Sequence, residues 1–111
     1  MKILFASDRD KKLFETKSDQ VRRFGPDAAK KLKARLDDLD AVDSMEDMRN
    51  LPGKWEELTG DRAGQFSARL TGALRLVVKP TRQPPPVKPD LGLDWRAIDS
   101  ITVIEVVDYH D

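Results

Sequence analysis

The chain contains no cysteine, and it has a single histidine among its 111 residues. A disulfide framework and a thiolate metal site are therefore excluded, and one histidine leaves no zinc site. The apolar run at the start covers only four residues, Ile3 to Ala6. Because a signal peptide or a membrane span needs a longer apolar stretch, we expect neither, and we predict a cytoplasmic protein that binds no membrane.

Glycine motifs that cradle phosphates are also missing. The sequence has neither the P-loop pattern nor the spaced glycines of dinucleotide-binding folds, and no recognisable nucleophile motif surrounds Ser44 or Ser67. Basic and acidic residues balance at 20 each, which argues against nucleic-acid binding through bulk charge. We therefore expect no cofactor and no metal ion.

Apolar and charged residues are both plentiful, at 39% and 36% of the chain. The apolar residues fall in periodic blocks, so we do not expect a disordered chain. The length suits one core, and we predict that residues 1–111 form a single domain.

Positive charge is concentrated in one segment. Between Gly53 and Lys88 the sequence has seven basic and three acidic residues, a local charge of +4. From Pro89 onward, one basic residue stands against six acidic ones. This asymmetry indicates a focused site for an anionic ligand.

Within the basic segment, alternation of apolar and polar residues predicts a β-hairpin. The alternation runs over residues 65–70 and resumes over 74–79, and the short connection contains a glycine. If the strands pair antiparallel and their apolar residues share a core, Arg69 and Arg75 lie side by side on the opposite face. Two rigidly held guanidiniums suit a phosphate or carboxylate ligand, with a merely solvated sheet face as the alternative.

Two helical patterns precede the hairpin. Ser7 and Asp8 offer N-cap oxygens, and apolar residues at helical spacing predict one helix from there to Gly25. A second pattern begins at Pro26 and continues to Leu39. We expect these helices to form a hairpin that packs on the sheet.

Shorter elements follow from local signals. Ser44 and Asp47 have the spacing of a capping box, which predicts a further helical turn with Met45, Met48 and Leu51 turned inward. Brief strands are expected at Lys2 to Ala6 and at Trp55 to Thr59.

Five prolines lie between Pro80 and Pro89. Proline lacks a backbone donor, so this stretch predicts an extended surface loop: a stiff connector, or alternatively a proline-rich ligand. A helical turn is expected around Trp95. The last strand, Ile101 to Tyr109, is apolar on both faces in its first half, which predicts a central strand covered on both sides.

The order of these elements predicts an α+β fold. An N-terminal helical hairpin would pack on one face of a mainly antiparallel sheet, in the order β-α-α-β-β-β, with the proline-rich insertion before the last strand. The other face is then left for a ligand.

The final residues offer groups for proton transfer. His110 is the only histidine, and alternation places it on the same side as Asp108 with Tyr109 opposite. Together with two arginines, such groups suit metal-independent cleavage of a phosphodiester. The alternative is a frayed chain end without catalytic meaning.

Several motifs resemble the RelE/ParE toxin superfamily, most closely its HigB-type branch. The resemblance rests on ELTGDRAGQFSARL, then LRLVVKP, then IEVVDYH at the end. A subset labelled killer suppression proteins resembles this chain in its proline-rich insertion, the tryptophan that follows and the terminal IEVVD. The match covers roughly the whole chain, and GDRAGQFS and EVVDYH are its most specific pieces.

The resemblance implies a toxin of a bacterial toxin–antitoxin pair. Such a toxin enters the ribosomal A site and cuts messenger RNA, and a helix-turn-helix antitoxin neutralises it, with higher toxin–antitoxin complexes as a further expectation. Residue roles are implied as well. Arg69 and Arg75 would hold phosphate, Asp108 and His110 would transfer protons, and Tyr109 would stack or donate. The expected RNA contacts are Lys54, Arg62 and Lys79.

Two features depart from that pattern. The chain is neutral overall, whereas ribosome-acting members are usually basic, and an insertion from Pro80 to Ile98 separates two strands of the expected site. Two alternatives therefore stay open. One is a ParE-like protein that inhibits gyrase without catalysis, and the other is a non-toxic protein of the same fold that binds an antitoxin or acts as a suppressor.

Overall fold

The computed structural model describes residues 1–108. Its strands are β1 (Lys2–Phe5), β2 (Glu56–Glu57), β3 (Phe66–Arg69), β4 (Leu74–Pro80) and β5 (Ser100–Asp108). Its helices are α1 (Asp8–Glu15), α2 (Lys17–Phe24) and α3 (Pro26–Ala41). Three 3₁₀ turns are η1 (Met45–Asn50), η2 (Gly60–Arg62) and η3 (Trp95–Ala97).

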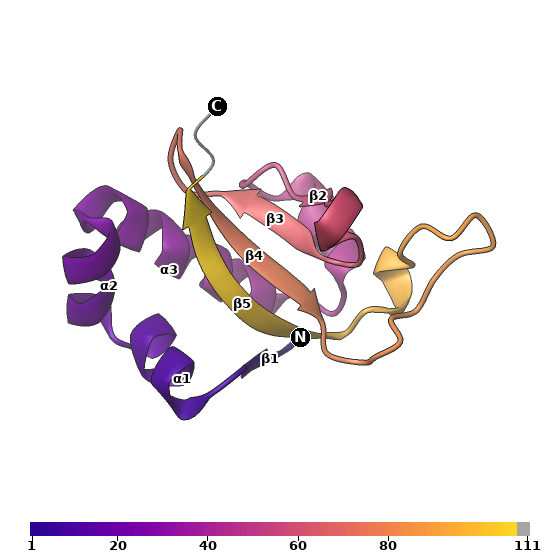
Figure 1. Ribbon diagram of the computed structural model, residues 1–111, viewed down its shortest axis with the longest axis horizontal. Coiled ribbons are helices and arrows are strands. Elements are labelled where there is room, and N and C mark those ends of the chain that lie inside the picture. The colour runs from indigo at the N-terminus through magenta and orange to yellow at the C-terminus, as the bar shows by residue number, and fades with distance from the viewer. Residues whose placement is uncertain (109–111) are drawn as a thin grey trace.

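The five strands form one mixed, mainly antiparallel sheet in the order β1-β5-β4-β3-β2. Only β1 and β5 run parallel, and a register shift between Val77 and Val78 marks a bulge where β4 pairs with β5. The three helices lie on one side of this sheet (Figure 1). The predicted α+β architecture is therefore confirmed, including the central place of the last strand.

The helix expected from Ser7 to Gly25 is wrong in one respect, because it is broken in two. The Ser7 side chain accepts from the Asp10 N–H as predicted, but Thr16 is extended, with φ −115° and ψ 108°. The break leaves the Phe14 carbonyl outside the regular helical hydrogen bonds. The buried Gln20 side-chain amide donates to this carbonyl at 2.9 Å. A β-branched residue with an extended backbone therefore separates α1 from α2, and a side chain satisfies the carbonyl at the break.

The second predicted helix is observed as α3. It begins at Pro26 in its first turn, after Gly25 at φ 89°. Its buried side includes Ala28, Leu32 and Leu39, as the apolar spacing indicates.

The core lies between α3 and the helix-facing side of the sheet. Leu32 and Leu39 pack in one cluster with side chains of β3, β4 and β5, most of them fully buried. The sheet residues of this cluster include Phe66, Ala68, Leu76, Val78, Ile101 and Val103. Each fully buried side chain of this size contributes about 1.5–3 kcal/mol, so this layer carries most of the stability.

The turn after α3 forms, although its predicted cap does not. Met45 and Met48 are buried in η1 and Leu51 is half-buried, as expected. Ser44, however, makes no side-chain cap, and the Asp47 carboxylate instead accepts from the Asp43 N–H at 3.3 Å. The acidic side chain thus stabilises the approach to the turn without a reciprocal capping box.

The segment between β4 and β5 is part exposed loop and part packed structure, and Figure 1 shows it extending away from the sheet. Residues 82–84 and 87–91 are exposed, in agreement with the predicted surface loop. The expected turn around Trp95 forms as η3, and Leu93, Trp95 and Ile98 are buried. The insertion therefore returns to the body of the protein before β5 begins.

The last strand is central, but the prediction that both of its faces are covered is wrong. Ile101 and Val103 are buried on the helix side, while Thr102 and Ile104 remain partly exposed. No helix within residues 1–108 is long and apolar enough to cross a membrane.

Candidate functional site

The strand register divides the sheet into a helix-covered face and an open face. Phe66 pairs with Val78 and Ala68 with Leu76 on the helix side, so the alternating pair Arg69 and Arg75 lies on the other side. The prediction that these two arginines are cross-strand neighbours is confirmed. We define the open face by the residues that share this side: Glu56, Ser67, Arg69, Arg75, Val77, Lys79, Thr102, Glu105 and Val107.

Arg75 is held against the turn of its own hairpin. Its Nη1 atom donates to the carbonyl oxygens of Thr71 at 2.9 Å, Gly72 at 3.3 Å and Leu74 at 3.1 Å. The Thr71 hydroxyl accepts from the Leu74 N–H at 3.1 Å and tightens the same turn. These contacts fix a half-buried guanidinium in place, whereas Arg69 on the adjacent strand is exposed.

Lys54 lies beside the Arg69 end of β3. The Arg69 N–H donates to the Gly53 carbonyl at 2.7 Å, and Lys54 itself has a positive φ of 49°. A left-handed conformation costs a non-glycine residue about 1–2 kcal/mol, and such strain is concentrated at functional positions. Lys54 thus lies close to Arg69, and its predicted RNA contact stays a prediction.

A buried arginine supports this corner from below. Arg35 of α3 reaches Arg69, with its Nε 3.5 Å from the Arg69 carbonyl, and Asp38 lies 3.8 Å from its Nη1. Gly53 is needed here, because a Cβ would lie 2.9 Å from the Arg35 side chain. Lys54, Arg69 and Arg75, with Arg35 beneath, form what we call the basic corner.

Arg62 extends over the open face, but it is already engaged. Its guanidinium donates to Gln65 Oε1 at 2.9 Å and forms an ion pair with Glu105 at 3.1 Å. The ion pair links the loop before β3 to the middle of β5. Arg62 therefore has a carboxylate of the open face as its partner, and its predicted RNA contact stays a prediction.

Lys79 shares the open face and yet lies away from the basic corner. It pairs with Thr102, four residues along β4 from Arg75. At about 3.3 Å per strand residue, roughly 13 Å of strand separate the two cations. Lys79 is therefore a separate cationic position on the open face.

The terminal trio is only partly described. Asp108 pairs with Leu74, so the pleat places it on the helix side, whereas the preceding Val107 pairs with Arg75 on the open face. Asp108 is exposed at the end of the sheet. Tyr109 and His110 lie outside the described residues, so their predicted places on the two sides stay predictions.

Glu56 is a charged residue of the open face that the sequence prediction did not name as a candidate. It pairs with Ser67 and is exposed on the open face, on the strand next to the one that carries Arg69. The signal was present in the pattern around it, because Trp55 is buried and Glu57 is half-buried. Because side chains alternate along a strand, inward-facing residues on both sides of Glu56 mean that Glu56 faces outward.

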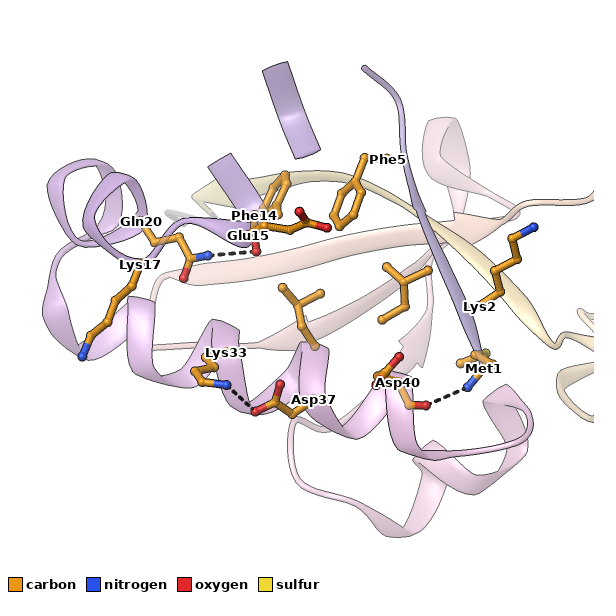
Figure 2. Close-up of a pocket in the computed structure, with 12 residues that line it drawn as sticks. Met1, Lys2, Phe5, Phe14, Glu15, Lys17, Gln20, Lys33, Asp37 and Asp40 are labelled. Carbon is orange, nitrogen blue, oxygen red and sulfur yellow. Dashed lines mark hydrogen bonds and ion pairs between the residues drawn. The ribbon is translucent and has the colours of Figure 1, made fainter. Parts of the chain in front are cut away.

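A pocket of about 590 Å³ lies on the opposite side of the molecule, among β1 and the three helices (Figure 2). Its apolar lining includes Ile3, Phe5 and Phe14. The rings of Phe5 and Phe14 stack with their centroids 6.1 Å apart. Its lining also includes three lysines and three carboxylates, and Lys33 pairs with Asp37 at 2.8 Å. The mixed charge gives no field for phosphate, so this pocket is not the predicted RNA site.

Metal ligation has no support among residues 1–108, where no three acidic or imidazole side chains gather as a metal site requires. The chemistry available on the open face is that of cations, the ion-paired Glu105 and the exposed Glu56. Such a set is suited to holding a phosphate and moving a proton.

Comparison with known proteins identifies the fold. No protein-family model matches the chain, and no curated protein matches it significantly. Among solved structures, a YoeB/ParE toxin from Agrobacterium tumefaciens superposes with a TM-score of 0.58 at 20% identity, over 99% of this chain and all of that one. YoeB of the YoeB–YefM complex from Staphylococcus aureus gives a TM-score of 0.55 at 19% identity, over 100% of this chain and 98% of that one. A YoeB dimer from the same organism gives the same values.

These identities are low, so the likeness establishes the fold and leaves the activity open. The agreement extends over nearly the full length of both chains. The chain thus has the fold of these YoeB/ParE toxins.

Proposed function

We propose that this protein is the toxin of a bacterial type II toxin–antitoxin pair, and that it cuts messenger RNA on the ribosome without a metal ion. The observation that carries the proposal is the cross-strand pair of Arg69 and Arg75 on the open face. The fold of the YoeB/ParE toxins supports it, and so do the sequence motifs that resemble the HigB-type branch.

The reaction is an internal transfer at phosphorus. The ribose 2′-oxygen attacks the adjacent phosphorus and loses its proton to a base, while the bond from phosphorus to the 5′-oxygen breaks. The leaving 5′-oxygen takes a proton from an acid. The products are a 2′,3′-cyclic phosphate and a 5′-hydroxyl, and the transition state carries extra negative charge on the phosphate oxygens.

The basic corner matches the need for charge stabilisation. Arg75 is fixed by three carbonyl contacts before substrate arrives, so little reorganisation is required when charge develops at phosphorus. Arg69 is exposed beside it and can bind a second phosphate oxygen. Lys54, Arg62 and Lys79 would bind the flanking RNA, with Arg62 exchanging its Glu105 partner for a phosphate.

Proton transfer is assigned to carboxylates and the terminal residues. The family resemblance implies Asp108 and His110 as the pair, with Tyr109 stacking on a base or donating a proton. The pleat directs Asp108 to the helix side at the end of β5, so the strand register does not support the expectation that it shares a face with Arg69 and Arg75. Glu56 adds a further candidate base, because it is exposed on the same face as Arg69. We assign the reaction to this set of groups, and substitution of each will determine its share.

The ribosome explains how a neutral protein reaches RNA. The chain has zero net charge, so bulk electrostatics supply little affinity for free RNA. A ribosome that already holds the message can present a single phosphodiester linkage to a small basic site. Cleavage then does not require the protein itself to bind RNA tightly. We therefore expect little cleavage of free RNA.

The partner follows from the same proposal. The YoeB toxin of S. aureus was solved in a heterotetrameric complex with YefM. We propose that this chain likewise pairs with an antitoxin, and the sequence resemblance points to one of helix-turn-helix type.

Inhibition of gyrase is the second candidate, because the Agrobacterium relative is described as YoeB/ParE. A gyrase inhibitor would need neither His110 nor the cleavage geometry of the basic corner. The two candidates therefore predict different damage in the cell, to messages in one case and to DNA in the other.

Expression in a bacterium without the partner gene tests the proposal. We expect growth arrest with new transcript ends inside coding regions, and both should vanish in an Arg69→Gln variant. Arrest with intact messages and a DNA-damage response would instead identify the gyrase inhibitor. Unchanged growth would identify a non-toxic protein of this fold.

A further inference from the structure

The sheet edge beside Arg69 has very little backbone pairing. β2 consists of two residues, and only Glu56 and Glu57 are in register with β3. Two more backbone bonds flank this pair, from the Leu58 N–H to the Gln65 carbonyl at 2.9 Å and from the Arg69 N–H to the Gly53 carbonyl at 2.7 Å. So short a strand is marginal by itself, so other contacts must hold it.

Glu57 supplies those contacts by binding the insertion. Its Oε1 accepts from the indole N–H of Trp95 at 2.5 Å, and its Oε2 accepts from the backbone N–H of Leu93 at 3.3 Å. The two donors lie 38 and 36 residues further along the chain. Hydrogen bonds to a carboxylate are among the strong ones, so they tie β2 firmly to a distant segment.

Trp95 is itself a rigid anchor. It is 5% exposed, and its ring lies edge-on to Phe66 with centroids 4.8 Å apart. The Arg49 guanidinium lies 3.7 Å from the centre of the Trp95 ring, and Glu46 binds Arg49 at 2.9 Å. Stacking, a cation and core packing thus fix the indole that Glu57 binds.

The base of the insertion is fastened at both ends. The Thr81 N–H donates to the Ser100 carbonyl at 3.0 Å, and the Met45 N–H donates to the Ile98 carbonyl at 3.0 Å. At the tip, Val87 and Leu91 are 50% and 82% exposed. The base, and not the tip, therefore has the rigidity to support β2.

Alternation along β2 connects this anchor to the open face. Glu57 pairs with Phe66 on the helix side, and Glu56 pairs with Ser67 on the open face. Fixing one residue fixes the direction of the other. We propose that Glu57 is a positioning residue: bound to Trp95 and Leu93, it holds Glu56 in place beside the basic corner. This inference rests on the proposed ribonuclease function.

The test compares Glu57→Ala with wild type in two measurements. In cleavage of a message on purified ribosomes, we expect kcat to fall about tenfold with KM within about twofold, because geometry is lost and binding is not. In amide hydrogen exchange, which needs no activity, we expect the Leu58 N–H to exchange at least about tenfold faster.

Conservative variants separate positioning from general damage. Glu57→Gln keeps an oxygen that accepts from the indole, so it should restore most of kcat. Trp95→Phe removes only the indole donor and keeps a ring against Phe66, so it should reproduce part of the loss. The double variant Glu57→Ala with Trp95→Phe should lose little more kcat than Glu57→Ala alone, because both substitutions break the same hydrogen bond. The matched control, Glu15→Ala, removes an exposed carboxylate from α1 and should change neither measurement.

The outcomes distinguish this inference from the proposed function. Unchanged Leu58 exchange in Glu57→Ala would overturn the inference, whether or not the protein cleaves RNA. Faster exchange with unchanged kcat would also overturn it, because Glu57 would then hold the edge without positioning a group that cleavage uses. Faster exchange with no cleavage by wild type would overturn the ribonuclease proposal. If Glu57→Ala does not fold, the same comparisons are made with Trp95→Phe.

Discussion

The two faces of the sheet use the same strands for opposite purposes. On the covered face, Phe66, Leu76 and Val78 are fully buried against the helices. On the open face of the same strands, Ser67 and Val77 are buried, whereas Arg69 is exposed and Arg75 is half-buried towards the hairpin end. Stability and the proposed activity are therefore separated by the alternation of side chains, and substitutions on one face should leave the other property nearly intact.

The largest expected effect comes from removing a buried side chain from the covered face. Phe66→Ala should lower the free energy of unfolding by about 3–5 kcal/mol, because it removes a fully buried ring and leaves a cavity. Urea denaturation measures this loss. A decrease below about 1 kcal/mol would mean that Phe66 does not have the role assigned to it in the core.

Arg69→Gln should have the converse effect. We expect cleavage on the ribosome to fall about 100-fold, since one cation at the developing charge is lost. The free energy of unfolding should change by less than about 0.5 kcal/mol, because the side chain is exposed. Arg82→Gln removes the same charge from an exposed loop residue and serves as the control. An equal loss in both variants would point to bulk charge and away from the basic corner.

Comparing lysine substitutions on the two strands sharpens the roles within the open face. Arg75→Lys keeps the charge but loses the planar group that binds the turn carbonyls, so we expect about a tenfold loss of kcat. Arg69→Lys should cost less, because Arg69 has no such turn to bind. Single-turnover kinetics of the two variants, measured side by side, gives the ranking, and the reverse order would contradict preorganisation by Arg75.

The smallest effect concerns the ion pair over the open face. Glu105→Gln removes the partner of Arg62, and the free energy of unfolding should fall by less than about 1 kcal/mol, because the pair is partly exposed. RNA binding should strengthen by about two- to threefold, since Arg62 is released and a negative charge is lost. Fluorescence anisotropy with a short RNA measures the change, and weaker binding would show that Arg62 is structural only.

The sequence predicted those parts of the molecule that depend on local periodicity. The register that makes Arg69 and Arg75 neighbours followed from alternation alone, and the start of α3 followed from Gly25 and Pro26. The break at Thr16 did not follow, because it depends on a bond from the Gln20 side chain to a main-chain carbonyl six residues earlier. No periodicity reports such a contact.

The site was predicted in part for the same reason. Glu56 was missed because β2 is only two residues long, too short for alternation to be read with certainty. The contact between Glu57 and Trp95 spans 38 residues and crosses the proline-rich insertion. A proline-rich stretch predicts a loop, but it does not predict where the residues after the loop pack.

The central claim is that the basic corner cuts messenger RNA held by the ribosome. The direct measurement is to add purified protein to a reconstituted translation system and to map new 5′-hydroxyl ends on the message. We predict discrete cuts with wild type, none with Arg69→Gln, and none on the same RNA without ribosomes. A message that stays intact with ribosomes present, while translation stops, would contradict the account.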